Sequence, residues 1–297
     1  MMAVQLGINP LTWTNDDLPS LGGDTPLEVC LAEGKQAGFA GFELGHKFPR
    51  EADKLNTVLA AHELKAVSGW YSLKLLERSA EEEITAMQPH LELLRDTGCK
   101  VMVCCEVTDC VHGDQSKPLS LRKPFPAERW QEFADKIDKV AMHALNHGVQ
   151  LAYHHHMGTV IQTEAEVDEL MSRTGPQLGL LLDSGHCLFS GCAPIVLAKR
   201  WANRIVHVHC KDIRKHVMDD AKNANLSFLN AVLNGVFTVP GDGCVDYPAL
   251  FAELKKNNYE GWLVVEAEQD PAVADPLTFA TLGHKNLQTM AAKAGLL

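Results

Sequence analysis

The chain has 297 residues and a mass of 32.6 kDa, a length at which α/β barrels commonly form one domain. Hydrophobic residues make up 46% and charged residues 22%, which are ordinary values for a globular protein. The 27 lysines and arginines against 38 aspartates and glutamates give a net charge of −11, which disfavours binding to a nucleic-acid backbone. No apolar run approaches the roughly 18 residues of a membrane span.

Two further features predict a cytoplasmic protein. The opening segment MMAVQLGINP has neither a basic stretch nor a cleavage pattern, so we expect no secretory signal. The nine cysteines are odd in number, lack a CxxC motif and include the adjacent Cys104 and Cys105, which argues against a disulfide framework. We therefore expect reduced thiols.

Eight short apolar runs alternate with longer amphipathic stretches along the chain. The runs show little polar alternation, as expected for parallel strands buried on both faces. Eight β-then-α rounds favour one (β/α)₈ barrel domain over residues 1–297, with an open doubly wound sheet as the alternative. The expected strands are Val4–Asn9, Phe39–Leu44, Lys65–Tyr71, Lys100–Glu106, Val149–His154, Leu178–Asp183, Arg204–His209 and Trp262–Glu266.

Helical patterns fill the intervals between these runs. Two connections are long: Asp109–Pro126 follows the fourth strand, and Asp212–Pro240 follows the seventh and contains a helix around Asn225–Leu233. Both leave the carboxyl ends of strands, where barrels place active sites, so they are candidates to cover a site. For the first, a variable surface loop is an equal alternative. The clearest helical patterns are Thr25–Ala37, Ala80–Asp96, Ala127–His147 and Asp246–Asn257.

Six of the eight runs end in a side chain that can ligate a metal ion. Such a group is costly to bury at the end of an apolar strand unless a partner compensates it, and a divalent cation shared by several strand ends would do so. These residues are Glu43, Glu106, His154 to His156, Asp183 with His186, His207 with His209, and Glu266.

The two-residue period of a strand selects one inward side chain from each of four neighbouring strands. His154 and His156 share a face of the fifth strand, and His207 and His209 share a face of the seventh. Mixed nitrogen and oxygen ligands suit Mn²⁺, Co²⁺, Fe²⁺ or Zn²⁺ better than Ca²⁺. The predicted metal ligands are His154, Asp183, His209 and Glu266.

Each of these residues has a simpler interpretation when taken alone. A lone histidine or aspartate at a strand end is more often a satisfied structural group than a ligand. The three-histidine run could also be an adventitious cluster. The coincidence at four neighbouring strand ends is what favours a metal site. Nearby Cys187, Cys192 and Cys210 are expected to be packing residues.

At these residues the chain resembles the xylose isomerase-like superfamily of metal-dependent (β/α)₈ barrels, which includes sugar isomerases, ketose epimerases, endonuclease IV and dehydratases. The resemblance implies a four-ligand site of Glu, Asp, His and Glu at strand ends. Asp183 in LLDSGH, His209 in HVHCKD and Glu266 in VVEAE match the last three positions. His154 stands where the first Glu is usual, which departs from the common pattern.

Within that superfamily, the sequence is similar to the inosose dehydratase family from Ile8 to Pro271. The most specific segments are LAYHHHMGT and GVFTVPGDG. The resemblance implies loss of water from 2-keto-myo-inositol, a cyclitol, to give a trihydroxycyclohexane dione, with Mn²⁺ or Co²⁺ as the metal. It also implies glutathione as a cofactor, although no segment of the sequence indicates a glutathione site.

Dehydration next to a ketone needs a Lewis acid on the carbonyl, a base for the α-proton and an acid for the departing hydroxyl. His156 is the first candidate for proton transfer because it shares the metal-facing side of its strand. Lys211 and Asp212 could instead pair with each other. The other catalytic candidates are Glu43, Glu106 and Lys211, and the candidates for binding substrate are His186, His207 and Asp212.

Three other functions compete with the lyase function. The related ketose epimerases use two metal-bound glutamates on opposite faces of the reacting carbon, and His154 in place of one disfavours an isomerase or epimerase of keto sugars. The net charge of −11 disfavours a DNA-repair nuclease. A metal-storing or regulatory barrel would bind metal without turnover. We therefore expect a small-molecule cyclitol as partner, no nucleic acid and no membrane, with a homo-oligomer left open.

Overall fold

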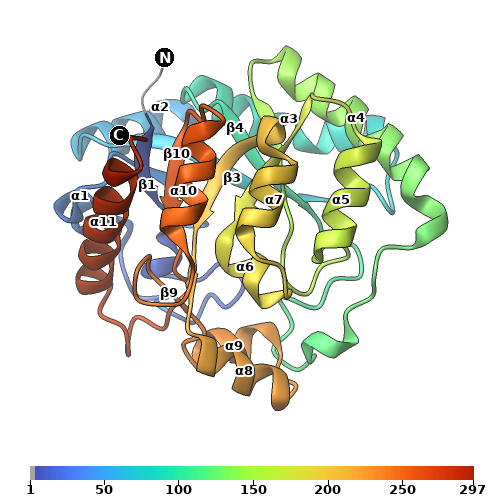
Figure 1. The fold of residues 1–297 in the computed structure, drawn as a ribbon. Coiled ribbons are helices and arrows are strands. Elements are labelled where there is room, and N and C mark those ends of the chain that lie inside the picture. The colour runs from blue at the N-terminus through green and yellow to red at the C-terminus, as the bar shows by residue number, and fades with distance from the viewer. Residues whose placement is uncertain (1–3) are drawn as a thin grey trace.

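The structure, a computed structural model, describes residues 4–297 and contains a closed barrel of eight parallel strands (Figure 1). The strand order is β1-β10-β7-β6-β5-β4-β3-β2, and β1 pairs with both β10 and β2. The predicted (β/α)₈ barrel is confirmed, with strand bounds that differ by at most two residues from the expected ones. The strands are β1 (Gln5–Ile8), β2 (Gly41–Leu44), β3 (Lys65–Leu73), β4 (Val101–Glu106), β5 (Gln150–His154), β6 (Leu178–Asp183), β7 (Ile205–Cys210) and β10 (Trp262–Val265).

Helices surround the barrel and bury their apolar faces against it. The helix expected over Ala80–Asp96 has these bounds, because Ser79 and Glu82 form a reciprocal cap at its start. The one expected over Ala127–His147 begins as a 3-10 turn, Ala127–Arg129, before the α-helix proper. The helices are α1 (Leu27–Ala37), α2 (Ala52–Ala61), α3 (Ala80–Asp96), α4 (Trp130–Asn146), α5 (Glu164–Arg173), α6 (Ser184–Phe189), α7 (Pro194–Arg200), α10 (Tyr247–Lys256) and α11 (Pro276–Lys293).

The main apolar core lies between the strands and the helices, and the barrel interior is narrow. Inside the barrel, Val103, Ala152 and Leu181 form a small apolar cluster of their own. Gly179 allows this narrow packing, since a Cβ there would lie 2.2 Å from a methyl carbon of Val206. The polar side chains at the carboxyl ends of the strands therefore lie above a layer of apolar side chains inside the barrel. Among residues 4–297, no helix is both long and apolar enough to span a membrane.

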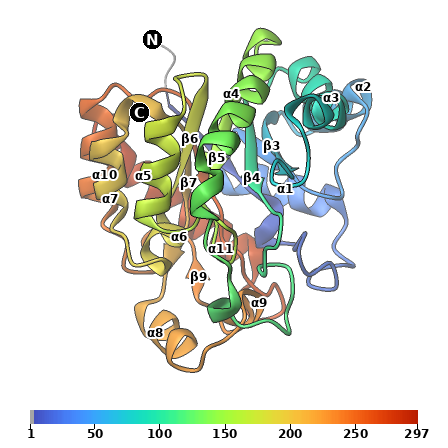
Figure 2. The same cartoon turned by 90° about the vertical axis from the view of Figure 1, so that its right-hand side faces the viewer.

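The long connection after β7 forms a small cap at the carboxyl ends of the strands, which we call the cap (Asp212–Pro240). Strands β8 (Asp212–Ile213) and β9 (Phe237–Thr238) pair antiparallel and enclose α8 (Lys215–Asn223) and α9 (Phe228–Leu233). In Figures 1 and 2 these helices lie at the end of the barrel opposite the C-terminus. The helix expected near its end is α9, whereas the sequence analysis did not identify α8.

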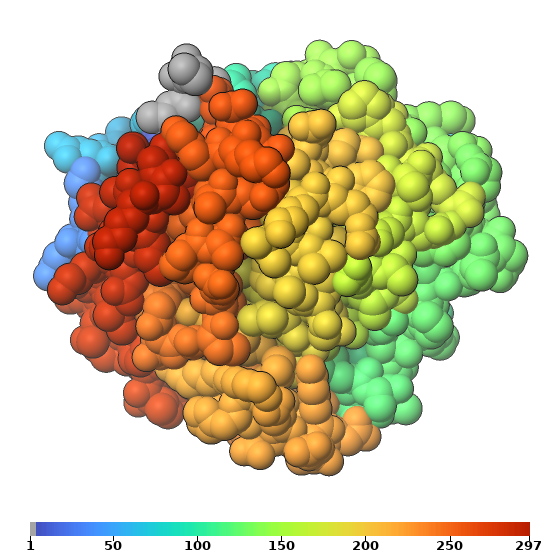
Figure 3. Space-filling model, in the orientation of Figure 1, coloured from blue at the N-terminus to red at the C-terminus, as the bar shows by residue number. Residues whose placement is uncertain are grey.

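The long connection after β4 meets the cap, and the two lie side by side at the lower edge of the molecule (Figure 3). Pro118 and Ser227 form an antiparallel bridge, and the Leu119 N–H donates to the Leu226 carbonyl at 3.0 Å. The two connections that were candidates to cover a site are therefore joined to each other.

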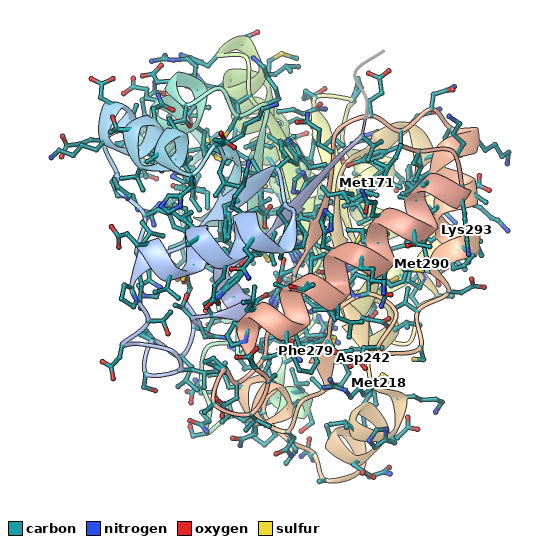
Figure 4. The ribbon with its side chains drawn as sticks, turned by 90° about the vertical axis from the view of Figure 1, so that its left-hand side faces the viewer. Met171, Met218, Asp242, Phe279, Met290 and Lys293 are labelled. Carbon is teal, nitrogen blue, oxygen red and sulfur yellow. The ribbon has the colours of Figure 1, made fainter. Side chains whose placement is uncertain are left out.

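A second attachment joins the cap to the last helix of the barrel. The Arg214 guanidinium donates to the Asp242 carboxylate at 2.7 Å and lies over the Phe279 ring at 5.9 Å. Figure 4 shows Asp242 and Phe279 close together at the first turn of α11. The cap is thus held on two sides.

Candidate metal centre

Four buried side chains from four neighbouring strands meet at the carboxyl end of the barrel. One potential ligand atom from each lies within 4.8 Å of the others. Two of these residues end their strands, one lies inside β7 and one directly follows β10. They are the predicted ligands, which the barrel register brings together: His154, Asp183, His209 and Glu266.

The contacts of His154 and Asp183 leave one ligand atom of each facing the cluster. His154 Nδ1 lies 3.0 Å from the carbonyl oxygen of His155 and donates to it, so Nε2 keeps its lone pair. Asp183 Oδ1 accepts the His186 N–H at 2.7 Å and caps α6. The other oxygen, Oδ2, lies 3.7 Å from His154 Nε2 and is a buried atom without a hydrogen-bond partner among residues 4–297.

His209 turns its two ring nitrogens to different groups. Its Nδ1 faces Glu266 Oε2 and lies 3.5 Å from Asp183 Oδ2, inside the cluster. Its Nε2 lies 3.1 Å from the carboxylate of Glu43, on the side away from the cluster. A metal-binding histidine held through its second nitrogen by a carboxylate is a common arrangement, because that contact fixes the ring and its tautomer.

Two imidazoles and two carboxylates form a donor set that fits a divalent cation, and the unpartnered, buried Oδ2 of Asp183 is one of its atoms. The set contains no thiolate, unlike most structural zinc sites.

Glu43, a predicted catalytic residue, is surrounded by hydrogen-bond donors. Asn9 donates to it at 2.7 Å, Ser68 at 2.5 Å, and the His207 Nε2 lies 2.8 Å away. Burial alone would raise the pKa of Glu43, but the imidazoles of His209 and His207 outweigh it and hold the pKa well below its ordinary value. The carboxylate is therefore a fixed anion behind His209, and His207, predicted to bind substrate, lies there too.

Lys211 is fully buried beside the cluster. Its Nζ lies 2.7 Å from Glu266, 2.5 Å from Glu268 and 3.1 Å from His186 Nε2. Burial alone would lower the pKa of Lys211, but the two carboxylates outweigh it and raise the pKa above its ordinary value. The ammonium thus bridges Glu266 and Glu268.

His156 lies next to this lysine group. Its Nδ1 lies 2.8 Å from the Met157 carbonyl oxygen and donates to it, which leaves Nε2 as an acceptor. Its ring lies 3.9 Å from that of His186 and 4.9 Å from that of Phe228 in the cap. Burial, together with the nearby His112 imidazole, holds the pKa of His156 well below its ordinary value, so the ring is neutral.

Two other predicted site residues are engaged elsewhere. Glu106 accepts the backbone N–H groups of Leu75 and Thr108 at 2.7 and 2.9 Å. Asp212 accepts four backbone N–H groups, among them those of Gly241 and Val245 at 2.8 and 2.9 Å. Both carboxylates hold loops in place and do not join the metal cluster. Asp212 also does not pair with Lys211 within the described chain.

A cleft that is partly open to solvent lies over the metal cluster. The sequence analysis missed Glu268, although its position two residues after Glu266 places it on the same face of an extended chain. It also missed Asp17 and Trp70, for which strand-end spacing gives no signal. The lining residues are Asn9, Leu11, Asp16, Asp17, Glu43, Leu44, Trp70, Val103, His154, His156, His209, Glu266 and Glu268.

The closed parallel barrel places a candidate metal site of buried histidines and carboxylates at the carboxyl ends of its strands. The chain is therefore a (β/α)₈ barrel of the class that carries its site at this face. A sequence model of the xylose isomerase-like TIM barrel family matches residues 31–285, and the chain belongs to that family.

Two curated relatives and one solved structure show how close the similarity is. The chain is 52% identical over 295 residues to the rhizopine catabolism protein MocC of Rhizobium meliloti, covering 99% of this chain and 91% of the relative. It is 44% identical over 295 residues to inosose dehydratase 2 of Bacillus cereus (strain ZK / E33L), covering 99% and 98%. A solved IolI protein with a bound zinc atom shares the fold, with 17% identity, a TM-score of 0.71 and coverage of 98% and 99%.

Proposed function

We propose that the protein is a metal-dependent hydro-lyase that removes water from 2-keto-myo-inositol and gives a trihydroxycyclohexane dione. The observation that carries the proposal is the buried cluster of His154, Asp183, His209 and Glu266 at the base of a cleft that is partly open to solvent. The 44% identity to an inosose dehydratase over almost the whole chain supports the substrate.

The four cluster residues would hold the cation, for which Mn²⁺ and Co²⁺ suit the mixed donors. When bound, the ion supplies Lewis acidity toward the ketone of the substrate. The anionic Glu43 orients His209, and Lys211 fixes Glu266 through one carboxylate oxygen. We assign both residues to positioning the ligands.

The proton transfer falls to His156. Its Nδ1–H is held by the Met157 carbonyl, so Nε2 is free to take the α-proton from the substrate. The departing hydroxyl needs one proton to leave as water, and the proton carried by His156 supplies it. Glu268, held by Lys211 at 2.5 Å, lines the cleft and can hydrogen-bond the substrate hydroxyls.

An epimerase of keto sugars is not favoured. It would need a second carboxylate at the reacting carbon, and His154 stands where related epimerases have a glutamate. Glu106, which could have supplied that carboxylate, is turned to the Leu75 and Thr108 N–H groups instead.

The test is ultraviolet absorbance after metal-free protein is mixed with 2-keto-myo-inositol and Mn²⁺ or Co²⁺ is added. A conjugated enol of the dione product should absorb where the substrate does not. We expect metal-dependent growth of this band, lost in His209→Ala and kept in a control, His216→Ala, which changes an exposed histidine of α8. Because of the MocC relative, rhizopine is assayed as a second substrate. A silent assay with folded, metal-loaded protein would exclude the inosose activity, and conversion of a ketose at constant mass would select the epimerase.

We further propose a cytoplasmic protein of one barrel domain. All nine cysteines lie in the described part of the chain and are free, which supports a reducing compartment. We assign no role to glutathione, because nothing in residues 4–297 indicates a site for it. Size-exclusion chromatography with light scattering would test whether the chain forms a homo-oligomer.

A further inference from the structure

We propose that Asp17 and His112 form a hydroxyl-binding pair at the rim of the cleft and determine which cyclitol is accepted. The inference rests on the proposed function, because it assigns a substrate hydroxyl to these two residues. Neither residue belongs to a barrel strand: Asp17 lies in the connection after β1, and His112 in the connection after β4.

Asp17 is held in place by its own loop. Asn15 Oδ1 accepts the backbone N–H groups of Asp17 and Leu18 at 2.9 and 2.8 Å, which fixes the turn that carries the carboxylate. The side chain lines the cleft and is 36% exposed, so it lies at the mouth of the cleft.

His112 comes from the other loop and lies directly behind Asp17, with its Nε2 3.8 Å from Asp17 Oδ1. Its side chain is only 9% exposed, and Nδ1 is a buried atom without a hydrogen-bond partner among residues 4–297. Its ring lies 5.0 Å from that of His156, the proposed proton acceptor. The Val111 N–H donates to the Gly158 carbonyl at 2.8 Å. A Cβ on Gly158 would lie only 2.9 Å from the backbone nitrogen of His112, so the two loops pack closely here. This close backbone packing holds His112 in position in its loop.

The distance between the two side chains is what points to a ligand. His112 Nε2 and Asp17 Oδ1 lie 3.8 Å apart, which is too long for a direct hydrogen bond. A hydroxyl group can accept from a ring N–H and donate to a carboxylate at the same time, so one hydroxyl oxygen can bridge the gap. A polyhydroxylated ring whose ketone is directed to the metal cluster presents such hydroxyls to the rim.

The variants Asp17→Asn and His112→Phe test the pair. Asn keeps the shape of the carboxylate, and Phe keeps a ring against His156 without its N–H. Asp109→Asn is the control, because Asp109 lies in the same loop as His112 and pairs with Lys123 on the surface at 2.9 Å. Asp109 has a φ of 58°, a conformation that Asn tolerates.

The assay uses 2-keto-myo-inositol and its monodeoxy analogues, each without one ring hydroxyl. We expect KM of both variants for the full substrate to rise about 10- to 100-fold, since the bridging hydroxyl loses one of its two hydrogen-bond partners, with kcat within about threefold. One deoxy analogue should be poor for the wild type and show no additional loss in the variants. Bound metal and the Asp109→Asn kinetics should be unchanged.

Three outcomes would overturn the inference: KM values within about twofold of the wild type, undiminished discrimination against every deoxy analogue, or a lower melting temperature as the sole change. The last would mean that the pair only joins two loops. If the wild type turns over none of these compounds, the proposed function fails by itself. Calorimetric binding of 2-keto-myo-inositol to the same metal-loaded variants would then still test the pair, and equal affinities would contradict it.

Discussion

The site combines two regions that are fixed in place by different means. The metal cluster lies at the ends of β5, β6, β7 and β10, where the parallel register of a closed barrel sets each position. The cap and the pair of Asp17 and His112 lie on connections between the strands, and side-chain packing and a few hydrogen bonds hold these connections. The difference teaches that the clustering of candidate ligands at strand ends can be predicted from strand periodicity, whereas the position of a loop residue such as His112 depends on how the loops pack.

The largest expected effect is in the strand-borne region, from Asp183→Asn. The amide oxygen can still accept the His186 N–H and cap α6, but the unpartnered Oδ2 is replaced by an NH₂ group that cannot bind a cation. We expect metal affinity to fall by more than about 100-fold, which is the upper end expected for a residue that only supports a ligand, and turnover to fall with it. Metal content after dialysis and the absorbance assay measure both.

Metal removal provides the control for this prediction. At free metal about 100 times Kd, bound metal should stabilise the wild type by about 3 kcal/mol, so a chelator should lower its melting temperature. It should leave Asp183→Asn unaffected. Equal chelator sensitivity in both proteins would show that Asp183 is not a ligand.

A smaller effect is expected one contact further out, from Glu43→Gln. The substitution leaves His209 and Glu266 in place but replaces the anion behind His209 with a neutral amide. We expect metal affinity to fall about 10- to 100-fold. Excess Mn²⁺ should restore most of the activity, because the ligands themselves remain. Glu63→Gln, at a side chain 82% exposed on the surface, is the matched control. No recovery at saturating metal would instead favour Glu43 as the catalytic base.

The loop-borne region should respond differently, and Phe228→Ala tests this. Phe228 is fully buried in the apolar core of the cap, and its ring lies 4.9 Å from that of His156 and 5.6 Å from that of His186. Removal of the side chain should lower the free energy of unfolding by about 3–5 kcal/mol, mainly because the cap is destabilised. We expect lower kcat with normal metal content. Loss of bound metal would show that the two regions are not independent.

The same contrast explains how much of the site could be predicted from the sequence. His154, Asp183 and Glu266 could be placed together because each ends an apolar run, and parallel strands bring their carboxyl ends to one face. Glu106 also ends a run, but its carboxylate is captured by backbone N–H groups of neighbouring loops, which strand periodicity cannot show. His112 carries no sequence signal, since only the packing of its loop against Gly158 brings it beside Asp17.

The smallest effect is expected from Ser227→Ala at the start of α9. The Ser227 Oγ accepts the Asn230 N–H at 3.2 Å, and the same residue forms the bridge to Pro118 that joins the cap to the other long connection. The bridge to Pro118 uses the backbone and survives the substitution. Only the hydrogen bond from the Asn230 N–H to the Ser227 hydroxyl, at the start of α9, is lost. We expect a stability loss of about 1 kcal/mol, measured by denaturant titration, with turnover and metal content unchanged. A tenfold loss of turnover from so small a change would mean that the position of α9 controls His156 far more tightly than the contact between Phe228 and His156 indicates. The cap and the strand-end cluster would then act as one unit.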